Sequence, residues 1–464
     1  MNYDLLIIGA GPAGYVCAIR AAQLGHKAAI IDKQWLGGVC LNVGCIPSKS
    51  LLKNAEVAHT LRHRAKEFGF SFDNLKLDYG ADVKRSRQVS SRLTKGVDFL
   101  MKKNKIDVHM GAAMLTSASS VEITAKDGSK QTHTAKNIVI ATGASVGTPP
   151  GVTLDGKKVL SYWEAILQET LPGSVVIIGG GAIGVEFATV WRAYGAEVAI
   201  VEMLPRLVPL EDEEVSKELT KEFTKKGIKV KAGTKLESMD PSGAKVKVKV
   251  SGAEGSETLE ADQVLVATGF KPNSKGIGLE AVGVKTNGRG FIEIDDGMKT
   301  NVLGVWAIGD VTGKLLLAHV GSAQGIVCAE TIAGHPTVTL DYDMMPRATY
   351  CHPQIASFGY TEAQAKEKGY EIKTAKFNFM ANGKALGMGD TSGWIKIVTD
   401  AKYGEILGAH MIGPEVTELL PELTLAHNLE LTAEEIARNV HAHPTLSEVI
   451  MEAAHGLTGG YIHM

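Results

Sequence analysis

The chain has 464 residues, of which 44% are hydrophobic and 22% charged, and its formal net charge is −2. A chain of this length folds as two or more domains, and its near-neutral charge gives no general attraction for nucleic acid or an anionic membrane. No apolar run approaches the roughly 20 residues that span a bilayer, and the N-terminal residues lack the pattern of a signal peptide. We therefore expect a cytoplasmic protein that binds neither nucleic acid nor membrane.

The first expected element is a strand over residues 5–8, which runs into Gly9-Ala10-Gly11-Pro12-Ala13-Gly14. A helix should follow, and then a strand over residues 28–31 that ends in Asp32. In such a unit the first glycine permits a tight turn, the second lets the backbone approach a pyrophosphate, and the third lets the helix pack on the strand. The helix N-terminus attracts the anion, and Asp32 is placed to accept hydrogen bonds from an adenosine ribose.

Two cysteines, Cys40 and Cys45, lie just after this unit in the segment Gly37–Lys49, which reads GGVCLNVGCIPSK. The chain has five cysteines, too few for a disulfide scaffold. No second pair completes a tetrahedral zinc site, so we expect no metal. Beside a nucleotide motif, the pair indicates a redox-active disulfide. The alternative is two structural thiols that happen to be close.

The dinucleotide pattern occurs a second time. A strand over 175–178 leads into Gly179-Gly180-Gly181-Ala182-Ile183-Gly184, and a strand over 198–201 ends in Glu202. In both copies the acid lies 23 positions after the first glycine. A lone glycine motif is a weak signal, because glycine turns are common. Two complete βαβ contexts with matching acids favour two bound dinucleotides over two ordinary turns.

A similar phrase follows each glycine unit, Ile-Val-Ile-Ala-Thr-Gly over 138–143 and Val-Leu-Val-Ala-Thr-Gly over 264–269. We expect both phrases to be strands that return to their sheets, with the glycine allowing close approach to a nucleotide. After about residue 345 a hairpin over 394–399 and 405–412 is expected, and helices follow it. Their apolar positions Val416, Leu419, Leu420, Leu423 and Ala426 recur at helical spacing. This apolar face either meets a partner or packs inside its own domain.

Four segments, in this order along the chain, resemble signatures of the pyridine nucleotide–disulfide oxidoreductases. They are the first glycine motif, the cysteine segment Gly37–Lys49, the segment Thr300–Asp310, and the segment His441–Glu448. The resemblance covers nearly the whole chain, and the most similar branch is the dihydrolipoamide dehydrogenases. It implies an α/β fold with two Rossmann-like domains, for FAD and NAD, and a C-terminal α+β dimerisation domain. The expected boundaries are 1–145 (FAD, first part), 146–270 (NAD), 271–345 (FAD and central, second part) and 346–464 (dimerisation).

The resemblance also implies which residues bind the two cofactors. Asp310 would bond the ribityl chain of FAD, the backbone near Ala318 would face the flavin ring, and Lys49 would pair with Glu186 near the flavin. The full FAD set is Gly9, Gly11, Pro12, Ala13, Gly14, Asp32, Lys33, Gly38, Val39, Lys49, Ala113, Thr142, Gly143, Gly309, Asp310 and Ala318. The NAD set is Gly179, Gly181, Ala182, Ile183, Gly184, Glu202, Leu236, Ala267 and Gly269. Phe270 stands where the family often has an arginine.

The implied chemistry is a thiol–disulfide exchange. A dihydrolipoyl thiolate attacks Cys40 and gives a mixed disulfide, the second substrate thiol closes the lipoyl ring, a Cys45 thiolate is left beside the flavin, and electrons pass through FAD to NAD. His443 is the expected base, because histidine exchanges protons near neutral pH. Glu448 would orient it, although its spacing from Thr445 is also that of a helix cap. The expected catalytic set is Cys40, Cys45, His443, Glu448, Lys49 and Glu186.

The expected activity is oxidation of dihydrolipoyl groups with reduction of NAD, carried out by a homodimer. Its partner would be the lipoyl domain of a 2-oxo acid dehydrogenase complex or the glycine cleavage H protein. The alternatives are another FAD-dependent disulfide reductase, such as a glutathione reductase, and a non-catalytic flavin-bound subunit. Glu202 opposes the first, because its charge repels the 2′-phosphate of NADP. The intact cysteine pair and base oppose the second, and the absence of a cysteine pair over 456–464 disfavours a mercuric reductase.

Overall fold

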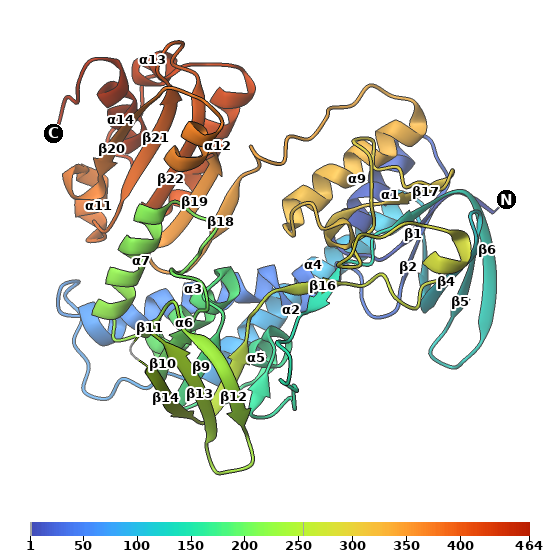
Figure 1. Ribbon diagram of the computed structural model, residues 1–464, viewed down its shortest axis with the longest axis horizontal. Helices are drawn as coiled ribbons and strands as arrows, with labels where there is room; N and C mark the ends of the chain where they lie inside the picture. Colours follow the sequence, from blue (N-terminus) through green and yellow to red (C-terminus); the bar gives the residue numbers. More distant parts are fainter. Residues whose placement is uncertain (1, 254) are drawn as a thin grey trace.

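The computed structural model of the protein describes residues 2–253 and 255–464. In these residues the strands form five sheets (Figure 1). The N-terminal sheet has the order β3-β2-β1-β6-β5-β4, and β17 pairs with β6. Its strands are β1 (Tyr3–Ile8), β2 (Ala28–Asp32), β3 (Asp107–Met110), β4 (Ala112–Ser117), β5 (Ser120–Thr124), β6 (Lys130–Ile140) and β17 (Val305–Ala307).

Strand β1 is buried on both faces, as in a parallel sheet that is covered on each side. Leu5 and Ile7 pack with α1 (Pro12–Gln23), α4 (Tyr79–Lys103) and α9 (Ala318–Ala333). Leu6 and Ile8 pack on the other face with the antiparallel β4–β5 layer and α8 (Leu279–Val282). The period of two along the strand thus divides its side chains between two cores.

Helices α1 and α9 pack in very close contact, although nearly 300 residues separate them (Figure 1). A Cβ built on Gly325 would lie 2.6 Å from Ala13 O, and one on Gly321 would lie 3.2 Å from Ala13 Cβ. Only glycine at these positions lets the backbones approach so closely. The contact brings the 3₁₀ turn Gly309–Thr312 beside the first glycine motif.

The second parallel sheet has the order β11-β10-β9-β15-β8. Its strands are β8 (Val159–Leu160), β9 (Ser174–Ile178), β10 (Glu197–Val201), β11 (Lys229–Lys231) and β15 (Gln263–Val266), and its helices are α5 (Tyr162–Leu167), α6 (Ala182–Tyr194) and α7 (Glu213–Lys225). A three-stranded sheet of β12 (Lys235–Asp240), β13 (Val246–Gly252) and β14 (Gly255–Ala261) covers one face. Two short strands, β7 (Ala144–Val146) and β16 (Phe270–Pro272), pair with each other. The two expected return strands are confirmed, because Ile140 pairs with Ile8 and Val266 with Ile178.

The C-terminal sheet is antiparallel, with the order β18-β19-β22-β21-β20. Its strands are β18 (Arg347–Thr349), β19 (Gln354–Gly359), β20 (Ile372–Asn378), β21 (Trp394–Asp400) and β22 (Ile406–Gly413). Its helices are α10 (Glu362–Glu367), α11 (Gly383–Met388), α12 (Val416–Asn428), α13 (Ala433–Arg438) and α14 (Glu448–Thr458), with a 3₁₀ turn at Phe379–Ala381. The expected hairpin is present as β21 and β22. The expected α/β fold class is confirmed.

The apolar face of α12 packs inside its own part of the chain. Val416, Leu420, Leu423 and Ala426 are buried against the C-terminal sheet, and Leu419 packs beside them. The hypothesis that this face meets a partner is therefore wrong, since its own sheet already covers it. Helical spacing alone could not distinguish the two possibilities, because both bury the same stripe.

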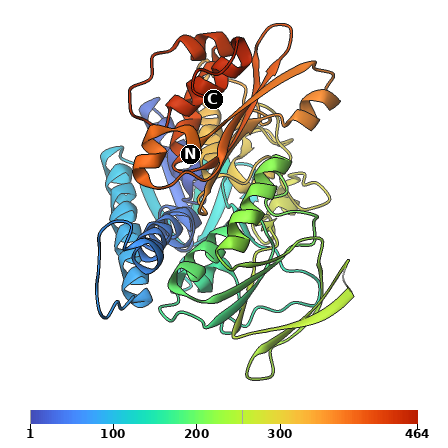
Figure 2. The same ribbon diagram turned by 90° about the vertical axis from the view of Figure 1, so that its left-hand side faces the viewer.

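Helices α2 (Gly38–Val43) and α3 (Cys45–His59) lie between the helices of the N-terminal sheet and those of the second sheet. Helix α3 packs against α4 on one side and α6 on the other, and continues into the single turn Thr60–Arg64. Figure 2 shows the C-terminal sheet on top of both other parts, with α7 reaching up to it. No helix in the described part of the chain is long and apolar enough to cross a membrane.

The packing of the first glycine turn predicts a difference between two glycines. A Cβ on Gly14 would lie 1.9 Å from Gly9 O, whereas a Cβ on Gly11 meets nothing within 4 Å. Gly14→Ala should therefore cost about 1–3 kcal/mol of stability, and Gly11→Ala less than about 1 kcal/mol. Thermal unfolding of the two variants beside the wild type measures this. Equal losses in the two variants would contradict the packing argument.

Candidate active site

The first glycine motif forms a tight turn from β1 into α1. Gly9 has φ 111°, and a Cβ there would lie 2.2 Å from Ala141 O on the returning strand. Gly14 is equally enclosed, by the carbonyl of Gly9. Gly11, at the N-terminus of α1, faces open space. A pyrophosphate requires open space beside the middle glycine and the positive end of a helix dipole, and Gly11 provides both. These residues therefore fit a dinucleotide such as FAD.

The second motif repeats this geometry from β9 into α6. Gly179 has φ 113°, and a Cβ there would lie 2.4 Å from Ala267 O. A Cβ on Gly184 would lie 2.0 Å from Gly179 O, whereas Gly181 again faces open space. In both copies the carbonyl of the alanine in the Ala-Thr-Gly sequence lies against the first glycine of the motif. This close backbone contact explains why the sequence occurs twice. These residues also fit a dinucleotide, such as NAD.

The two acidic residues, Asp32 and Glu202, have two roles. Each accepts a hydrogen bond from its glycine turn, and each lies where a ribose would bind. Asp32 Oδ2 accepts a 2.8 Å hydrogen bond from Ala10 N, and Oδ1 accepts one of 2.8 Å from Gln34 N. Glu202 Oε2 likewise accepts a 2.6 Å bond from Gly180 N. Sequence reasoning missed this bond between the acid and the turn, although the equal spacing of the two acids was its signal. The same carboxylate thus shapes the turn and keeps lone pairs for a ligand.

Ala113 and Leu236 occupy equivalent places in the two halves. Gly111 N donates to Asp32 O over 2.9 Å, and Ala113 follows two residues later in β4. Thr234 N donates to Glu202 O over 2.9 Å, and Leu236 follows two residues later in β12. Each expected contact residue is therefore fixed relative to the acid of its own motif.

The cysteine pair lies where α2 ends and α3 begins. Cys40 is in α2, Cys45 is the first residue of α3, and both are half-buried free thiols. The hydrogen bond from the Cys40 thiol, the charge of Lys49 and the N-terminus of α3 together lower the pKa of Cys45, against the opposing effect of burial. The same hydrogen bond, with burial, raises the pKa of Cys40. When the reduced pair loses one proton, Cys45 rather than Cys40 therefore takes the negative charge.

The segment between the cysteines is held by two residues that sequence reasoning did not identify. Asn42 Nδ2 donates to Leu36 O over 3.0 Å and to Gly38 O over 2.8 Å. The Arg87 guanidinium, from α4, donates to Asn42 O. The sequence carried no signal for Arg87. This residue of the long helix α4 lies 45 positions after Asn42 and reaches it only in the folded chain.

The expected ion pair between Lys49 and Glu186 is present. Lys49 Nζ lies 3.1 Å and 3.0 Å from the two carboxylate oxygens of Glu186, and Tyr350 N donates to the same carboxylate over 2.9 Å. Burial lowers the pKa of Lys49, but the charge and hydrogen bond of Glu186 raise it by more. Lys49 therefore remains a cation one helical turn from Cys45.

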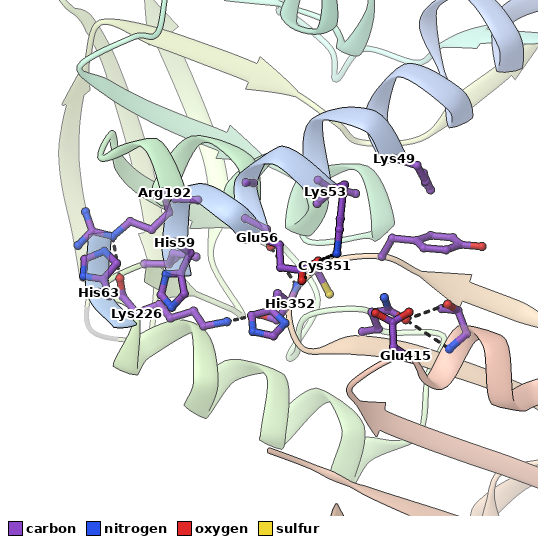
Figure 3. Close-up of a pocket in the computed structure, with 18 of the residues that line it drawn as sticks. Lys49, Lys53, Glu56, His59, His63, Arg192, Lys226, Cys351, His352 and Glu415 are labelled. Carbon is purple, nitrogen blue, oxygen red and sulfur yellow. Dashed lines mark hydrogen bonds and ion pairs between the residues drawn. The ribbon is translucent and has the colours of Figure 1, made fainter. Parts of the chain in front are cut away.

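A cavity of about 760 Å³ extends from Lys49 along α3 to His63 (Figure 3). Figure 3 shows Lys53, His59 and His352 between these ends. Cys351 also lines the cavity, but its thiol is buried and donates to Pro353 O over 3.2 Å. Burial raises the pKa of Cys351, so this cysteine is a structural thiol. The cavity reaches Lys49, next to the redox site, but neither redox cysteine lines it.

Asp310 lies in the 3₁₀ turn Gly309–Thr312, and the first residue of α9 is Ala318. Burial raises the pKa of Asp310 to about 6, and no donor or cation offsets it within the described ranges. A buried carboxylate without a partner is costly unless a ligand hydroxyl donates to it. The Asp310 carboxylate therefore fits the ribityl chain of FAD. The unpaired N–H groups at the start of α9 fit a flavin carbonyl.

The other expected FAD residues lie nearby in the chain or in space. Thr142 Oγ1 donates to Asn273 O over 2.8 Å, and Asn273 N donates to Gly143 O over 3.0 Å. These bonds fix the end of the returning strand against β16. Lys33 is exposed, and Val39 is half-buried in α2.

The expected base is on the surface of the C-terminal part. His443 Nδ1 lies 2.9 Å from Glu448 Oε1, and 77% of the His443 side chain is exposed. Thr445 N donates to Glu448 Oε2 over 2.8 Å. Although burial raises the pKa of Glu448, the bonds from Thr445 and His443 lower it overall. The expected capping box is half present, because Glu448 accepts from Thr445 N, whereas the Thr445 hydroxyl bonds to Ala442 O and Ser447 Oγ and α14 begins only at Glu448.

His441 has a different environment. Its side chain is 4% exposed and lies 2.8 Å from the Glu422 carboxylate, which raises the pKa of His441. It holds the loop before α14, as expected for a structural histidine. Across residues 2–253 and 255–464, no group of three or more potential ligands is arranged to hold a metal ion.

Comparison with known proteins places this geometry in a family. Residues 3–325 match the family model described as pyridine nucleotide-disulphide oxidoreductase, and residues 345–454 match its dimerisation domain. The chain belongs to the pyridine nucleotide-disulphide oxidoreductases. The expected family, the expected enzyme class and the expected cofactors, FAD and NAD, are thereby confirmed.

Members of this family match the chain over its full length. The dihydrolipoyl dehydrogenase of Mycobacterium leprae is 54% identical, and the match covers 100% of this chain and 99% of that protein. The dihydrolipoyl dehydrogenase of Corynebacterium glutamicum is 53% identical with the same coverage. Among solved structures, LpdA from Mycobacterium tuberculosis has a TM-score of 0.91 at 26% identity, covering 98% of this chain and 99% of that one. The HOCl-induced flavoprotein disulfide reductase RclA from Escherichia coli has a TM-score of 0.86 at 26% identity, covering 97% and 99%.

The raised pKa of Asp310 predicts a pH dependence of FAD binding in this family member. Without FAD, the carboxyl keeps its proton up to about pH 6. Hydroxyls that donate to the carboxylate favour its charged form and lower its pKa. Binding then releases a proton, so FAD affinity should rise with pH up to about 6 and level off above it.

Fluorescence titration of the FAD-stripped chain with FAD, between about pH 5 and about pH 8, measures this dependence. Asp310→Asn should flatten the curve, because the amide does not titrate. A wild-type affinity that falls as the pH rises through this range would contradict the assignment of Asp310.

Proposed function

We propose that the protein is a dihydrolipoyl dehydrogenase, which oxidises dihydrolipoyl groups and reduces NAD. The observation that carries this proposal is the cysteine pair, with Cys40 in α2 and Cys45 at the start of α3, one helical turn from the Lys49–Glu186 ion pair. Relatives named dihydrolipoyl dehydrogenase, which are 43–54% identical over 97–100% of the chain, support the choice of substrate. The dinucleotide turns at Gly9–Gly14 and Gly179–Gly184 supply the two cofactor sites.

The proposed exchange begins with the pair oxidised to a disulfide. A dihydrolipoyl thiolate attacks Cys40 Sγ, the Cys40–Cys45 bond breaks, and a mixed disulfide forms. The second substrate thiolate attacks the substrate sulfur of that mixed disulfide and closes the lipoyl ring. The substrate has then lost two electrons and two protons, and the pair is reduced. A bound FAD would supply the chemistry by which the electron pair reaches NAD as hydride.

The environment of each cysteine fits its proposed role. Cys45 is the better leaving group, because the N-terminus of α3 and Lys49 stabilise its thiolate. Glu186 keeps Lys49 charged and in place, so it acts on the thiolate through the lysine. His443 would take the substrate proton, and Glu448 would orient its ring.

The position of His443 supports a shared active site. The imidazole is exposed, and it belongs to the part of the chain that matches a dimerisation domain. We infer that the protein is a symmetric homodimer in which His443 of one subunit serves the cysteine pair of the other. The lipoyl domain of a 2-oxo acid dehydrogenase complex, or the glycine cleavage H protein, would deliver the substrate. The domain boundaries at residues 145, 270 and 345, the remaining cofactor contacts and the cytoplasmic location stay predictions.

Glu202 supports NAD over NADP. The side chain is 8% exposed and accepts backbone N–H groups from Gly180 and Leu204. These bonds fix the carboxylate at the ribose position, where its negative charge repels a 2′-phosphate. An NADPH-dependent glutathione reductase is therefore disfavoured.

A comparison of initial rates tests the proposed activity. Dihydrolipoamide with NAD should be turned over efficiently, whereas glutathione disulfide with either reduced nicotinamide cofactor should react far more slowly. NADP should replace NAD poorly. Efficient reduction of glutathione disulfide, or equal rates with the two cofactors, would refute the proposal.

The asymmetry of the cysteine pair predicts different flavin spectra for two variants. Cys40→Ser leaves the Cys45 thiolate beside the flavin site and should retain long-wavelength flavin absorbance. Cys45→Ser should lose that absorbance, and both variants should lose dihydrolipoamide oxidation. Visible spectra at neutral pH make the comparison, with Cys351→Ser as a control that changes neither property. Identical spectra for the two redox-cysteine variants would overturn the assigned roles.

The shared site predicts complementation between two inactive variants. Cys45→Ser subunits and His443→Ala subunits should each be inactive as homodimers. Subunit exchange should create heterodimers with one intact site each, so activity should recover as exchange proceeds. Native mass spectrometry verifies the exchange. A fully active monomer, or verified heterodimers without activity, would exclude a site built from two subunits.

A further inference from the structure

A buried lysine of the C-terminal sheet lies among three carboxylates. Lys396, in β21, has a side chain that is 4% exposed. Its Nζ lies 2.9 Å from Asp212 Oδ2, 2.8 Å from Glu214 Oε2 and 2.9 Å from Glu362 Oε1. Glu362 belongs to the C-terminal part, whereas Asp212 and Glu214 stand at the start of α7. The cluster therefore joins two parts of the molecule.

The neighbouring bonds extend this connection over four strands of the C-terminal sheet. Glu211 is buried, accepts a hydrogen bond from Ser357 Oγ in β19, and lies 3.7 Å from Arg347 Nε in β18. Lys376 in β20 lies 2.9 Å from Glu214. The short acidic stretch 211–214 is thus held by one side chain from each of β18, β19, β20 and β21. Figures 1 and 2 both show α7 between the second sheet and the C-terminal sheet.

The other end of the same loop reaches the second glycine motif. Leu204 N donates to Glu202 Oε1 over 2.7 Å, and Val208 N donates to Gly180 O over 2.8 Å. The Leu207 side chain fills the space beside Gly180, where a Cβ would lie 2.6 Å from Leu207 Cδ2. A segment of the chain that begins at the acid of the dinucleotide site thus ends on the C-terminal sheet.

We propose that Lys396 is a positioning residue for NAD. It acts through Asp212 and Glu214, which fix the loop 203–212 against the Gly179–Gly184 turn, and it does not touch the cofactor. The inference rests on the proposed function, because it takes the second glycine motif as the NAD site. Buried charges that lose their partners are strongly destabilised, so the lysine and its carboxylates stay together. A loop held in place before binding loses less conformational entropy when the nucleotide arrives.

Two variants and one matched control test the proposal. Lys396→Met removes the cation from the cluster. Asp212→Asn removes one ionic bond, and it keeps the N-cap of α7, because asparagine caps helices as well as aspartate does. Glu362→Gln, the control, changes the same cluster on the side that does not touch the loop.

The readouts separate the NAD half of the cycle from the dithiol half. Both test variants should raise the KM and the equilibrium Kd for NAD by between about 2-fold and about 30-fold. The KM for dihydrolipoamide and the rate at which it reduces the flavin without NAD should stay at the wild-type value. Glu362→Gln should leave all four quantities unchanged.

Three results would overturn the proposal. They are wild-type NAD affinity in a folded Asp212→Asn variant, a parallel loss of dihydrolipoamide reaction, and an equal effect of Glu362→Gln. If Lys396→Met does not fold, the Asp212→Asn variant decides on the proposal. Lys396 keeps its ion pairs with Glu214 and Glu362 in that variant, so its charge stays compensated. A wild-type chain inactive toward dihydrolipoamide would refute the proposed function, whereas the NAD titrations would still decide on the positioning role.

Discussion

Three parts of the chain meet at the carboxylate of Glu186. Lys49 reaches it from α3, Glu186 itself belongs to α6, and Tyr350 N donates to it at the start of the C-terminal sheet. A buried carboxylate needs such partners, because unpaired burial of its charge would be costly. The same contact keeps a cation beside the Cys45 thiol. One ion pair therefore joins three parts of the chain and contributes to the lowered pKa of Cys45.

The two nucleotide turns show how a repeated local constraint gives a repeated site. In each, a carboxylate binds the turn that a glycine makes possible, and the returning strand closes against the first glycine. The surroundings differ between the copies. Helix α9 packs on the first unit, whereas the loop 203–212 connects the second to the C-terminal sheet. The first site is thus enclosed by close backbone packing, and the second is bordered by a loop held through ionic bonds.

The features that the sequence predicted are those with a local signature. Glycines at fixed spacing, the acid after each second strand, the paired cysteines and the β21–β22 hairpin all depend on neighbouring residues. Lys49, Glu186 and Asp310 came from the family resemblance, because no local pattern distinguishes them from ordinary surface charges. The positions of Arg87 and Lys396 depend on tertiary contacts across 45 and more than 180 residues. The direction of the α12 apolar face was equally open, because a helical stripe does not say what covers it.

The close contact of α1 with α9 has a consequence for how the protein is made. The glycine-lined surface of α9 that receives Ala13 begins at residue 318, about 300 residues after α1 leaves the ribosome. Translation at about 5–20 residues per second takes roughly 15–60 s to cover that distance. During this interval the side of α1 that packs on α9 and the edge of β6 that pairs with β17 have no native cover. The nascent N-terminal part therefore cannot complete its fold in the order of synthesis, and its exposed face is a place where a chaperone would act.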